Sequence, residues 1–180
     1  MRQWQVRSER MRELLHVRNI RLMSGLFDAE YYRATCPTAN RMSVSPFLHF
    51  ALVGAFQGCS PHPLFDTEFY LRTYPDVREA GVNPLLHYLL DGAPEGRKPH
   101  PLFDPTHYLL GCPEARDSKK APLVHFLKAK RNWADPHPLF HCATWLAHNP
   151  DAAISGINPL VHYVLCRSHL WKEGSFAAVT

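Results

Sequence analysis

The sequence predicts an all-α protein made of four tandem copies of one short unit. Four phenylalanines recur at spacings of 38, 38 and 37 residues: Phe27, Phe65, Phe103 and Phe140. Four histidines each follow 22 residues later: His49, His87, His125 and His162. A constant internal spacing, with variation only in the connection, is typical of tandem structural repeats. No segment shows the apolar–polar alternation of a strand or a hairpin turn pair.

The spacing divides the chain into an N-terminal segment, four repeats and a tail. The segment covers residues 1–24, the repeats cover 25–62, 63–100, 101–137 and 138–175, and the tail covers 176–180. Four units of this period account for the 180 residues better than one globular core does. We expect the repeats to form a short solenoid or a compact bundle.

The N-terminal segment, residues 1–24, predicts one amphipathic helix. Apolar residues such as Trp4 lie among six arginines and two glutamates, and no Gly or Pro occurs before Gly25. This segment carries the whole net charge of +4. One interpretation is a cap over the end of the first repeat. Another is a surface for anionic membrane or a partner, contacted through Arg7, Arg10 and Arg18. A disordered tail is the third.

Each repeat predicts two short helices, and the first begins at an acidic residue. An aspartate follows the phenylalanine in three copies: Asp28, Asp66 and Asp104. Aspartate is a favoured N-cap because its carboxylate accepts from the unpaired N–H groups of the first turn. The fourth copy has His141, so we expect a weaker cap there. A proline near each helix end should stop it: Pro37, Pro75, Pro113 and Pro150.

The second helix has a proline at its first position in every copy: Pro46, Pro84, Pro122 and Pro159. Proline is tolerated there because its missing N–H has no helical partner anyway. The residue before it is Ser45, Asn83 or Asn158 in three copies, all good N-caps, and Ala121 in the third. Gly92 should end this helix in the second copy, and Gly54 in the first.

The recurring aromatic and leucine residues predict the core. Helices of about nine residues are marginal alone in water, so packing must hold them. In the second copy the core would contain Phe65, Tyr70, Leu85, Tyr88 and Leu89. A row of sugar-stacking platforms is the alternative interpretation of the aromatic residues.

The histidines do not predict a metal site or a cofactor. One ion needs ligands at about 2 Å, whereas stacked helices lie about 8–10 Å apart, so histidines on successive units cannot share it. We expect the recurring histidines to donate to a carbonyl or to a capping aspartate. Three further histidines lie in proline-rich connections: His62, His100 and His137.

One charged turn, Glu95-Gly96-Arg97-Lys98, offers candidate contacts for an anion or a partner. Arg97 could bind a phosphate or carboxylate bidentately, with Lys98 beside it. An ordinary solvated turn is the alternative. The small basic group near residues 128–131 is too limited to favour nucleic acid binding.

The five cysteines include no C-x-x-C pair. Cys36 and Cys112 share one repeat position, which Tyr74 and Asn149 occupy in the other copies. We therefore expect reduced thiols in a cytoplasmic protein. No apolar run is long enough to cross a membrane. Serine-hydrolase, zinc-protease and P-loop motifs are missing from the sequence, which does not favour an enzyme.

The second copy resembles a short repeat of bacterial surface-polysaccharide proteins. The motifs that carry the resemblance are Tyr-Pro-Asp-Val at 74–77, Asn-Pro-Leu at 83–85, His-Tyr at 87–88 and Glu-Gly-Arg at 95–97. In those proteins the repeat flanks glycosyltransferase domains, and similar units occur in some secreted repeat-in-toxin-type proteins. The resemblance covers about residues 25–175 and implies association with glycosyltransferases or glycan-export proteins, without transferase activity.

The sequence thus favours a non-catalytic helical-repeat interaction module, cytoplasmic or peripheral to the inner membrane. A glycan-binding module using Trp133, Trp145 and Trp171 is one alternative. Others are a membrane-surface adaptor working through residues 1–24, a small transferase or hydrolase with a pocket of converging His and carboxylate groups, and a fragment of a glycosyltransferase whose catalytic domain lies outside this chain.

Overall fold

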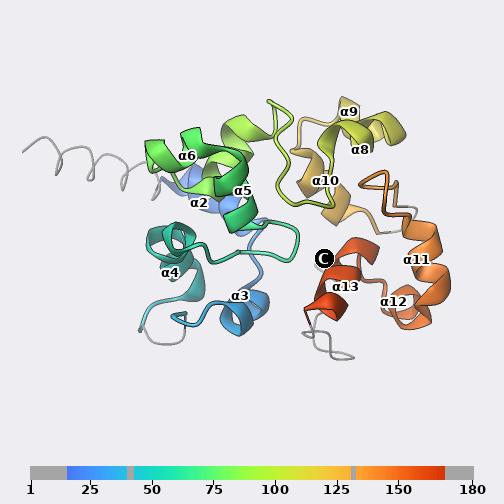
Figure 1. Ribbon diagram of the computed structural model, residues 1–180, viewed down its shortest axis with the longest axis horizontal. Helices are drawn as coiled ribbons and strands as arrows, with labels where there is room; N and C mark the ends of the chain where they lie inside the picture. The colour runs from blue at the N-terminus through green and yellow to red at the C-terminus, as the bar shows by residue number, and fades with distance from the viewer. Residues whose placement is uncertain (1–15, 40–42, 131–132, 169–180) are drawn as a thin grey trace, which may run out of the picture. The chain divides into compact units, whose positions relative to one another are not determined.

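The computed structural model describes residues 16–39, 43–130 and 133–168, and these residues form twelve α-helices and no strand (Figure 1). The all-α prediction is confirmed. The chain divides into two compact units, residues 1–92 and 93–180. None of the helices in the described ranges is long and apolar enough to span a bilayer.

Unit 1, residues 1–92, contains the first two copies. Its elements are α2 (Val17–Ser24), α3 (Ala29–Thr35), α4 (Pro46–Leu52), the 3₁₀ helix η1 (Gly54–Gln57), α5 (Thr67–Thr73), α6 (Pro75–Ala80), α7 (Pro84–His87) and the π-helical turn η2 (Tyr88–Gly92). Helix α2 lies against α7 and buries Met23. The rest of the predicted N-terminal helix, residues 1–15, lies outside the described residues.

Unit 2, residues 93–180, contains the third and fourth copies. Its helices are α8 (Pro105–Gly111), α9 (Pro113–Asp117), α10 (Pro122–Lys128), α11 (Cys142–His148), α12 (Pro150–Ser155) and α13 (Pro159–Arg167). Each unit therefore holds two copies of the aromatic repeat in the same order along the chain.

Copies two to four contain three helices each, not the predicted two. The proline that ends the first helix also begins a further short helix, at Pro75, Pro113 and Pro150. The prediction used proline only as a stop, although proline at the first helical position is favourable. The extra helix ends at a left-handed glycine in two copies, Gly81 (φ 59°) and Gly156 (φ 69°).

The predicted first-helix caps are formed. Asp28 accepts from the N–H groups of Glu30 and Tyr31, and the aspartates of copies two and three cap their helices in the same way. The His141 side chain makes no cap bond, as its sequence predicts. The Asp135 Oδ1 accepts from the Cys142 N–H at 2.8 Å, as the Ser60 Oγ accepts from the equivalent Thr67 N–H in the second copy.

A second-helix asparagine ties the two copies of each unit together. Asn83 caps α7 with Oδ1, and its Nδ2 donates to the Ala51 carbonyl of the preceding copy at 3.3 Å. Asn158 does the same in unit 2, donating to the Phe126 carbonyl at 3.3 Å. Ala121 has no side-chain amide and makes no cap bond. The asparagine that the sequence identifies as a cap therefore also forms a hydrogen bond to the preceding copy.

Four aromatic clusters form the core, one in each copy. Each contains the repeat phenylalanine, the aromatic residue five positions later and the aromatic residue that follows the histidine. In the second copy Phe65, Tyr70, Leu85 and Tyr88 are fully buried, and Leu89 is half-buried. This burial agrees with the predicted packing role.

Gly54 does not have the predicted helix-ending role. It begins η1 and is not among the described glycines with positive φ. A Cβ added there would lie 1.9 Å from the Tyr32 hydroxyl oxygen. The glycine is therefore required by close packing against Tyr32, a contact that the local sequence does not reveal.

The prediction of reduced thiols is wrong for two of the five cysteines. Cys36 and Cys59 form a disulfide, with their Cα atoms 5.5 Å apart. The repeat position of Cys36 does not form a disulfide in the other copies, where it is Tyr74, Cys112 or Asn149. Only the first copy adds Cys59 at the partner site, and the fold brings the two residues together across 23 positions of sequence.

Candidate functional site

The recurring histidine contacts an aromatic side chain of its own copy in all four copies. The Nδ1 atoms lie 2.7, 3.0 and 2.8 Å from the Tyr32, Tyr70 and Tyr108 hydroxyls in the first three copies. In the fourth, the Trp145 Nε1–H donates to His162 Nδ1 at 3.1 Å. The aromatic partners were not expected, whereas an aspartate partner of the expected kind is found in the fourth copy, where His162 Nε2 lies 3.0 Å from Asp151 Oδ2 in the first turn of α12. The fold places residues 17 positions apart on facing helices, which sequence spacing alone does not indicate.

Burial disfavours ionisation of two of these three tyrosines, Tyr32 and Tyr108. Tyr32 is fully buried, and desolvation raises its pKa to about 12. Desolvation also raises the pKa of Tyr108, with nearby Cys112 acting in the same direction. The Tyr32 hydroxyl therefore stays protonated near pH 7, which supports a structural role for its hydrogen bond to His49.

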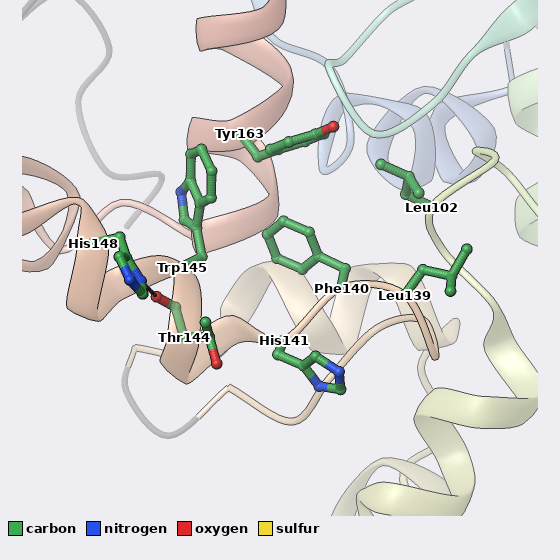
Figure 2. A pocket seen from close by; sticks show the side chains of 8 residues that line it. All are labelled: Leu102, Leu139, Phe140, His141, Thr144, Trp145, His148 and Tyr163. Carbon is green, nitrogen blue, oxygen red and sulfur yellow. Dashed lines mark hydrogen bonds between the residues drawn. The ribbon is translucent and has the colours of Figure 1, made fainter.

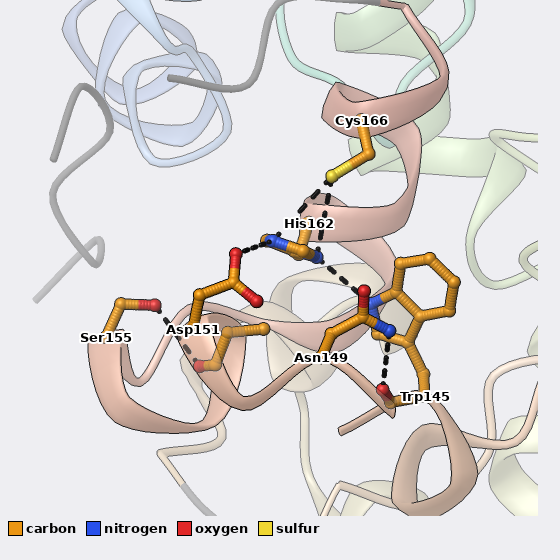
Figure 3. Close-up of polar contacts among 7 residues, drawn as sticks. Trp145, Asn149, Asp151, Ser155, His162 and Cys166 are labelled. Atoms are coloured by element: carbon orange, nitrogen blue, oxygen red, sulfur yellow. Dashed lines mark hydrogen bonds and ion pairs between the residues drawn. The ribbon is translucent and has the colours of Figure 1, made fainter. Parts of the chain in front are cut away.

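The fourth copy has a fixed imidazole tautomer (Figure 3). The Trp145 indole can only donate, so His162 Nδ1 must accept. The proton is therefore on Nε2, which donates to Asp151 Oδ2 at 3.0 Å. Desolvation opposes ionisation of Asp151, but the hydrogen bonds from His162 and the Ala152 N–H outweigh it, and its pKa lies below the ordinary value.

Cys166 gives this cluster the composition of a cysteine-nucleophile triad. Its Sγ lies 3.7 Å from both ring nitrogens of His162. Both nitrogens are already occupied, one by Trp145 and the other by Asp151, so neither can take the thiol proton. Desolvation also raises the pKa of Cys166, with the Asp151 charge adding to it. The arrangement does not meet the requirements for thiol activation.

The connection histidines organise tight turns. In each Pro-His-Pro-Leu-Phe stretch the histidine Nδ1 accepts from the N–H of the following leucine, at 3.0, 3.1 and 3.1 Å for His62, His100 and His137. Their carbonyls accept from the N–H of the repeat phenylalanine at 3.0 Å. Among the described residues no group of three His, Cys, Asp or Glu side chains could hold a metal ion.

Two of the candidate anion contacts, Arg97 and Lys98, form ion pairs within the chain. Arg97 Nε donates to Glu95 Oε2 at 2.6 Å, and Lys98 Nζ lies 2.7 Å from Asp104 Oδ2. Arg18 is exposed on α2, while Arg7 and Arg10 lie outside the described residues.

An apolar hollow of about 360 Å³ opens in unit 2 at the start of the fourth copy (Figure 2). It is lined by Leu102, Leu139, Phe140, His141, Thr144, Trp145, His148 and Tyr163. Leu139 is 81% exposed beside it. The lining contains no carboxylate, and His148 Nδ1 is bonded to the Thr144 carbonyl at 2.8 Å. Converging histidine and carboxylate groups, which the enzyme alternative requires, are not found at this hollow.

Sequence reasoning did not identify this hollow. The signal was present, because Leu139 belongs to the recurring Pro-His-Pro-Leu-Phe stretch, but its exposure could not be predicted. Trp145 lines this hollow, and Trp133 lines a different one of about 390 Å³ near Ile154. The two tryptophans therefore do not share one groove, and Trp171 lies outside the described residues.

Comparisons with models of protein families, with curated protein sequences and with solved structures gave no match.

Proposed function

We propose that this chain is a non-catalytic helical-repeat interaction module that serves glycosyltransferases of bacterial surface-polysaccharide synthesis. The hollow beside Leu139 is the observation that carries the interaction part of the proposal. An exposed leucine next to partly exposed Trp145 and Tyr163 rings is the kind of surface that protein partners bury. The glycosyltransferase association comes from the resemblance of the second copy and supplies the class of partner.

The polar groups of the repeats support binding over catalysis. The recurring histidines, the capping aspartates and the Arg97 and Lys98 side chains bond within the chain. Groups used in this way hold short helices in place and leave side chains such as Leu139 to interact outside. We propose that the four copies stack as a short solenoid or a compact bundle.

The cellular location belongs to the same proposal. The Arg-rich segment favours the cytoplasmic face of the inner membrane. The Cys36–Cys59 disulfide favours an oxidising compartment instead. A non-reducing gel of the protein taken from its native cells, with thiols alkylated at lysis, decides between them. A fully bonded pair would overturn the cytoplasmic assignment.

Affinity capture tests the main proposal. The full chain, immobilised, is exposed to a native bacterial extract, and the bound proteins are identified by mass spectrometry. We expect glycosyltransferases or glycan-export proteins to be enriched. The matched control is the R7Q/R10Q/R18Q variant. Retention of the same partners would assign binding to the repeats, whereas their loss would assign it to the N-terminal segment.

A glycan-binding module is the second candidate, because the Trp145 and Tyr163 rings line one hollow. Aromatic faces of this kind can stack on sugars. Titration of the chain with soluble polysaccharide fragments, followed by calorimetry, tests it. Saturable heat that disappears in the Trp145→Ala variant would favour glycan binding, and an absence of heat would remove it.

A further inference from the structure

In each unit the backbone N–H that follows the repeat phenylalanine of the first copy bonds to the turn that opens the second copy. The Asp28 N–H donates to the Pro61 carbonyl at 2.9 Å in unit 1, and the Asp104 N–H donates to the Pro136 carbonyl at 2.8 Å in unit 2. Pro61 and Pro136 are the first residues of Pro-His-Pro-Leu-Phe turns. These turns therefore dock onto the start of the preceding copy in the same way twice.

The docked turn shields the start of the preceding helix. Burial, and then the nearby charges of Asp66 and Asp28, raise the pKa of Tyr31 to about 12. Asp66 follows directly after the turn of the second copy, so Tyr31 lies between its own cap and the incoming copy. The inner aromatic residues of the two copies that carry a docked turn, Tyr32, Phe50, Tyr108 and Phe126, are at most 1% exposed, and Tyr70 and Tyr88 of the second copy are 0% exposed.

The fourth copy presents the same face with nothing docked on it among the described residues. Its equivalent inner residues, Trp145 and Tyr163, are only half-buried, and both line the hollow. Of the three equivalents of Leu139, Leu26 and Leu64 are 1% and 0% exposed and Leu102 is half-buried, against 81% exposure for Leu139 itself.

The hydrogen-bond donor of this face is also present. His141 occupies the position of Asp28 and Asp104, and it lines the hollow. Its backbone N–H has no partner within the part of the chain that the structure describes. The lining of the hollow and the His141 N–H therefore occupy the repeat positions at which the first and third copies each accept a turn.

We propose that this hollow binds the Pro-x-Pro-Leu-Phe turn that opens a repeat of the same kind in a partner protein. The partner's first proline carbonyl would accept from the His141 N–H, and its leucine would pack against Leu139 and the Trp145 and Tyr163 rings. This inference rests on the proposed interaction function and names the chemistry of the partner.

A second copy of this chain is not the expected occupant. Its turns at 61–65 and 136–140 already close their own units. In its third turn, at 99–103, Leu102 already lines the hollow of its own chain. Its first repeat is preceded by Ser24-Gly25 in place of a Pro-x-Pro stretch, and the adjoining Leu26 is only 1% exposed. We therefore expect the turn to come from a partner protein.

The test uses a fluorescein-labelled cyclic peptide with the sequence of residues 60–67, Ser-Pro-His-Pro-Leu-Phe-Asp-Thr, titrated with the full chain. Cyclisation holds the turn and lowers the entropy cost of binding. We expect saturable binding that the Leu139→Asp variant weakens at least ~tenfold, since a buried carboxylate is strongly disfavoured. The indole N–H signal of Trp145, identified by its loss in Trp145→Phe, should shift on titration.

Leu110→Asp is the matched control, because Leu110 is 74% exposed but does not line the hollow. Equal weakening by the two variants, or no saturable binding, would overturn the proposal. Leu139-dependent self-association in sedimentation would also overturn it, because the occupant would be a second copy. Binding that appears only after removal of residues 169–180 would do the same, because the chain's own end would be the occupant.

Affinity capture separates this inference from the proposed function. If Leu139→Asp still captures glycosyltransferases, the function stands and the docking site is wrong. If the peptide binds as expected but no glycosyltransferase is captured, the docking site stands and the partner class is wrong.

Discussion

Units 1 and 2 share one repeat frame but stabilise it by different means. Both have two copies joined by an asparagine amide and by a docked Pro-His-Pro-Leu-Phe turn. Unit 1 adds a disulfide and helix α2, whereas unit 2 has Trp145 and Asp135 at the positions that Tyr70 and Ser60 occupy in unit 1. The comparison teaches that the repeated positions build the fold, while the non-repeated positions supply stability particular to each unit.

The disulfide should make the largest difference between the units. Its loss in Cys59→Ser removes a cross-link over 23 residues and should cost about 3 kcal/mol of unfolding free energy. Peptide-resolved hydrogen exchange should show the loss in residues 16–92. Cys112→Ser, at the repeat position equivalent to Cys36, is the control. Equal losses in both variants would mean that the cross-link does not set unit 1 apart.

Gly54→Ala should break the tyrosine–histidine pair of unit 1. The new Cβ would overlap the Tyr32 hydroxyl, and displacing that group would leave His49 Nδ1 without its partner. We expect a loss of roughly 2–3 kcal/mol, measured by urea unfolding. Gly111→Ala meets nothing within 4 Å and is the control, with a change below about 1 kcal/mol. A tolerated Gly54→Ala would contradict the close-packing role.

The Asn83 and Asn158 hydrogen bonds should contribute equally to the unfolding free energy of the two units. Asn83→Ala and Asn158→Ala each remove a helix cap and a buried bond to the preceding copy, at a cost of roughly 1–2 kcal/mol. Ala121→Asn should have the opposite sign, because it adds a cap acceptor worth about 0.5–1 kcal/mol. Thermal unfolding of the three variants checks both signs. Unequal losses of stability at Asn83 and Asn158 would show that the two units do not use this contact between copies equally.

The smallest expected effect is an acid sensitivity of unit 2. Burial, and then the charge of Lys98, lower the pKa of His137 below 6.5, with His107 acting in the same direction and Asp104 opposing. Between the folded and unfolded pKa values the unfolded chain binds more protons, so unfolding free energy should fall as pH drops below about 6.5. Protonation also removes the Nδ1 acceptor for the Leu139 N–H.

Urea unfolding at a series of pH values measures this effect. His137→Gln should flatten the dependence, and the same substitution at exposed His148 should leave it unchanged. A steeper dependence in His137→Gln would contradict the assignment.

The local signals of the sequence predicted a large part of the fold. The spacing of phenylalanine and histidine predicted the repeats, and the Asp and Asn caps predicted the helix starts. The predicted core residues Phe65, Tyr70, Leu85 and Tyr88 are buried. The extra helices after Pro75, Pro113 and Pro150 were missed, because proline was interpreted as a stop and not also as a start.

The candidate site could not be predicted in the same way. Leu64 and Leu139 occupy one repeat position in identical local sequence, yet one is 0% and the other 81% exposed. Exposure depends on which neighbour covers a residue, and that is a property of the packed chain. The aromatic partners of the recurring histidines were missed for a related reason, because they lie 17 residues away on another helix.

The sequence by itself determined what depends on neighbouring residues: helix starts, helix ends, the repeat period and the apolar face of each helix. Backbone hydrogen bonding and capping act over a few residues, so local sequence is sufficient for them. Only the tertiary structure decided the Cys36–Cys59 bond, the contact of Gly54 with Tyr32, the fixed tautomer of His162 and the open face at Leu139. These features join groups that are distant in sequence, and close packing alone decides which of them meet.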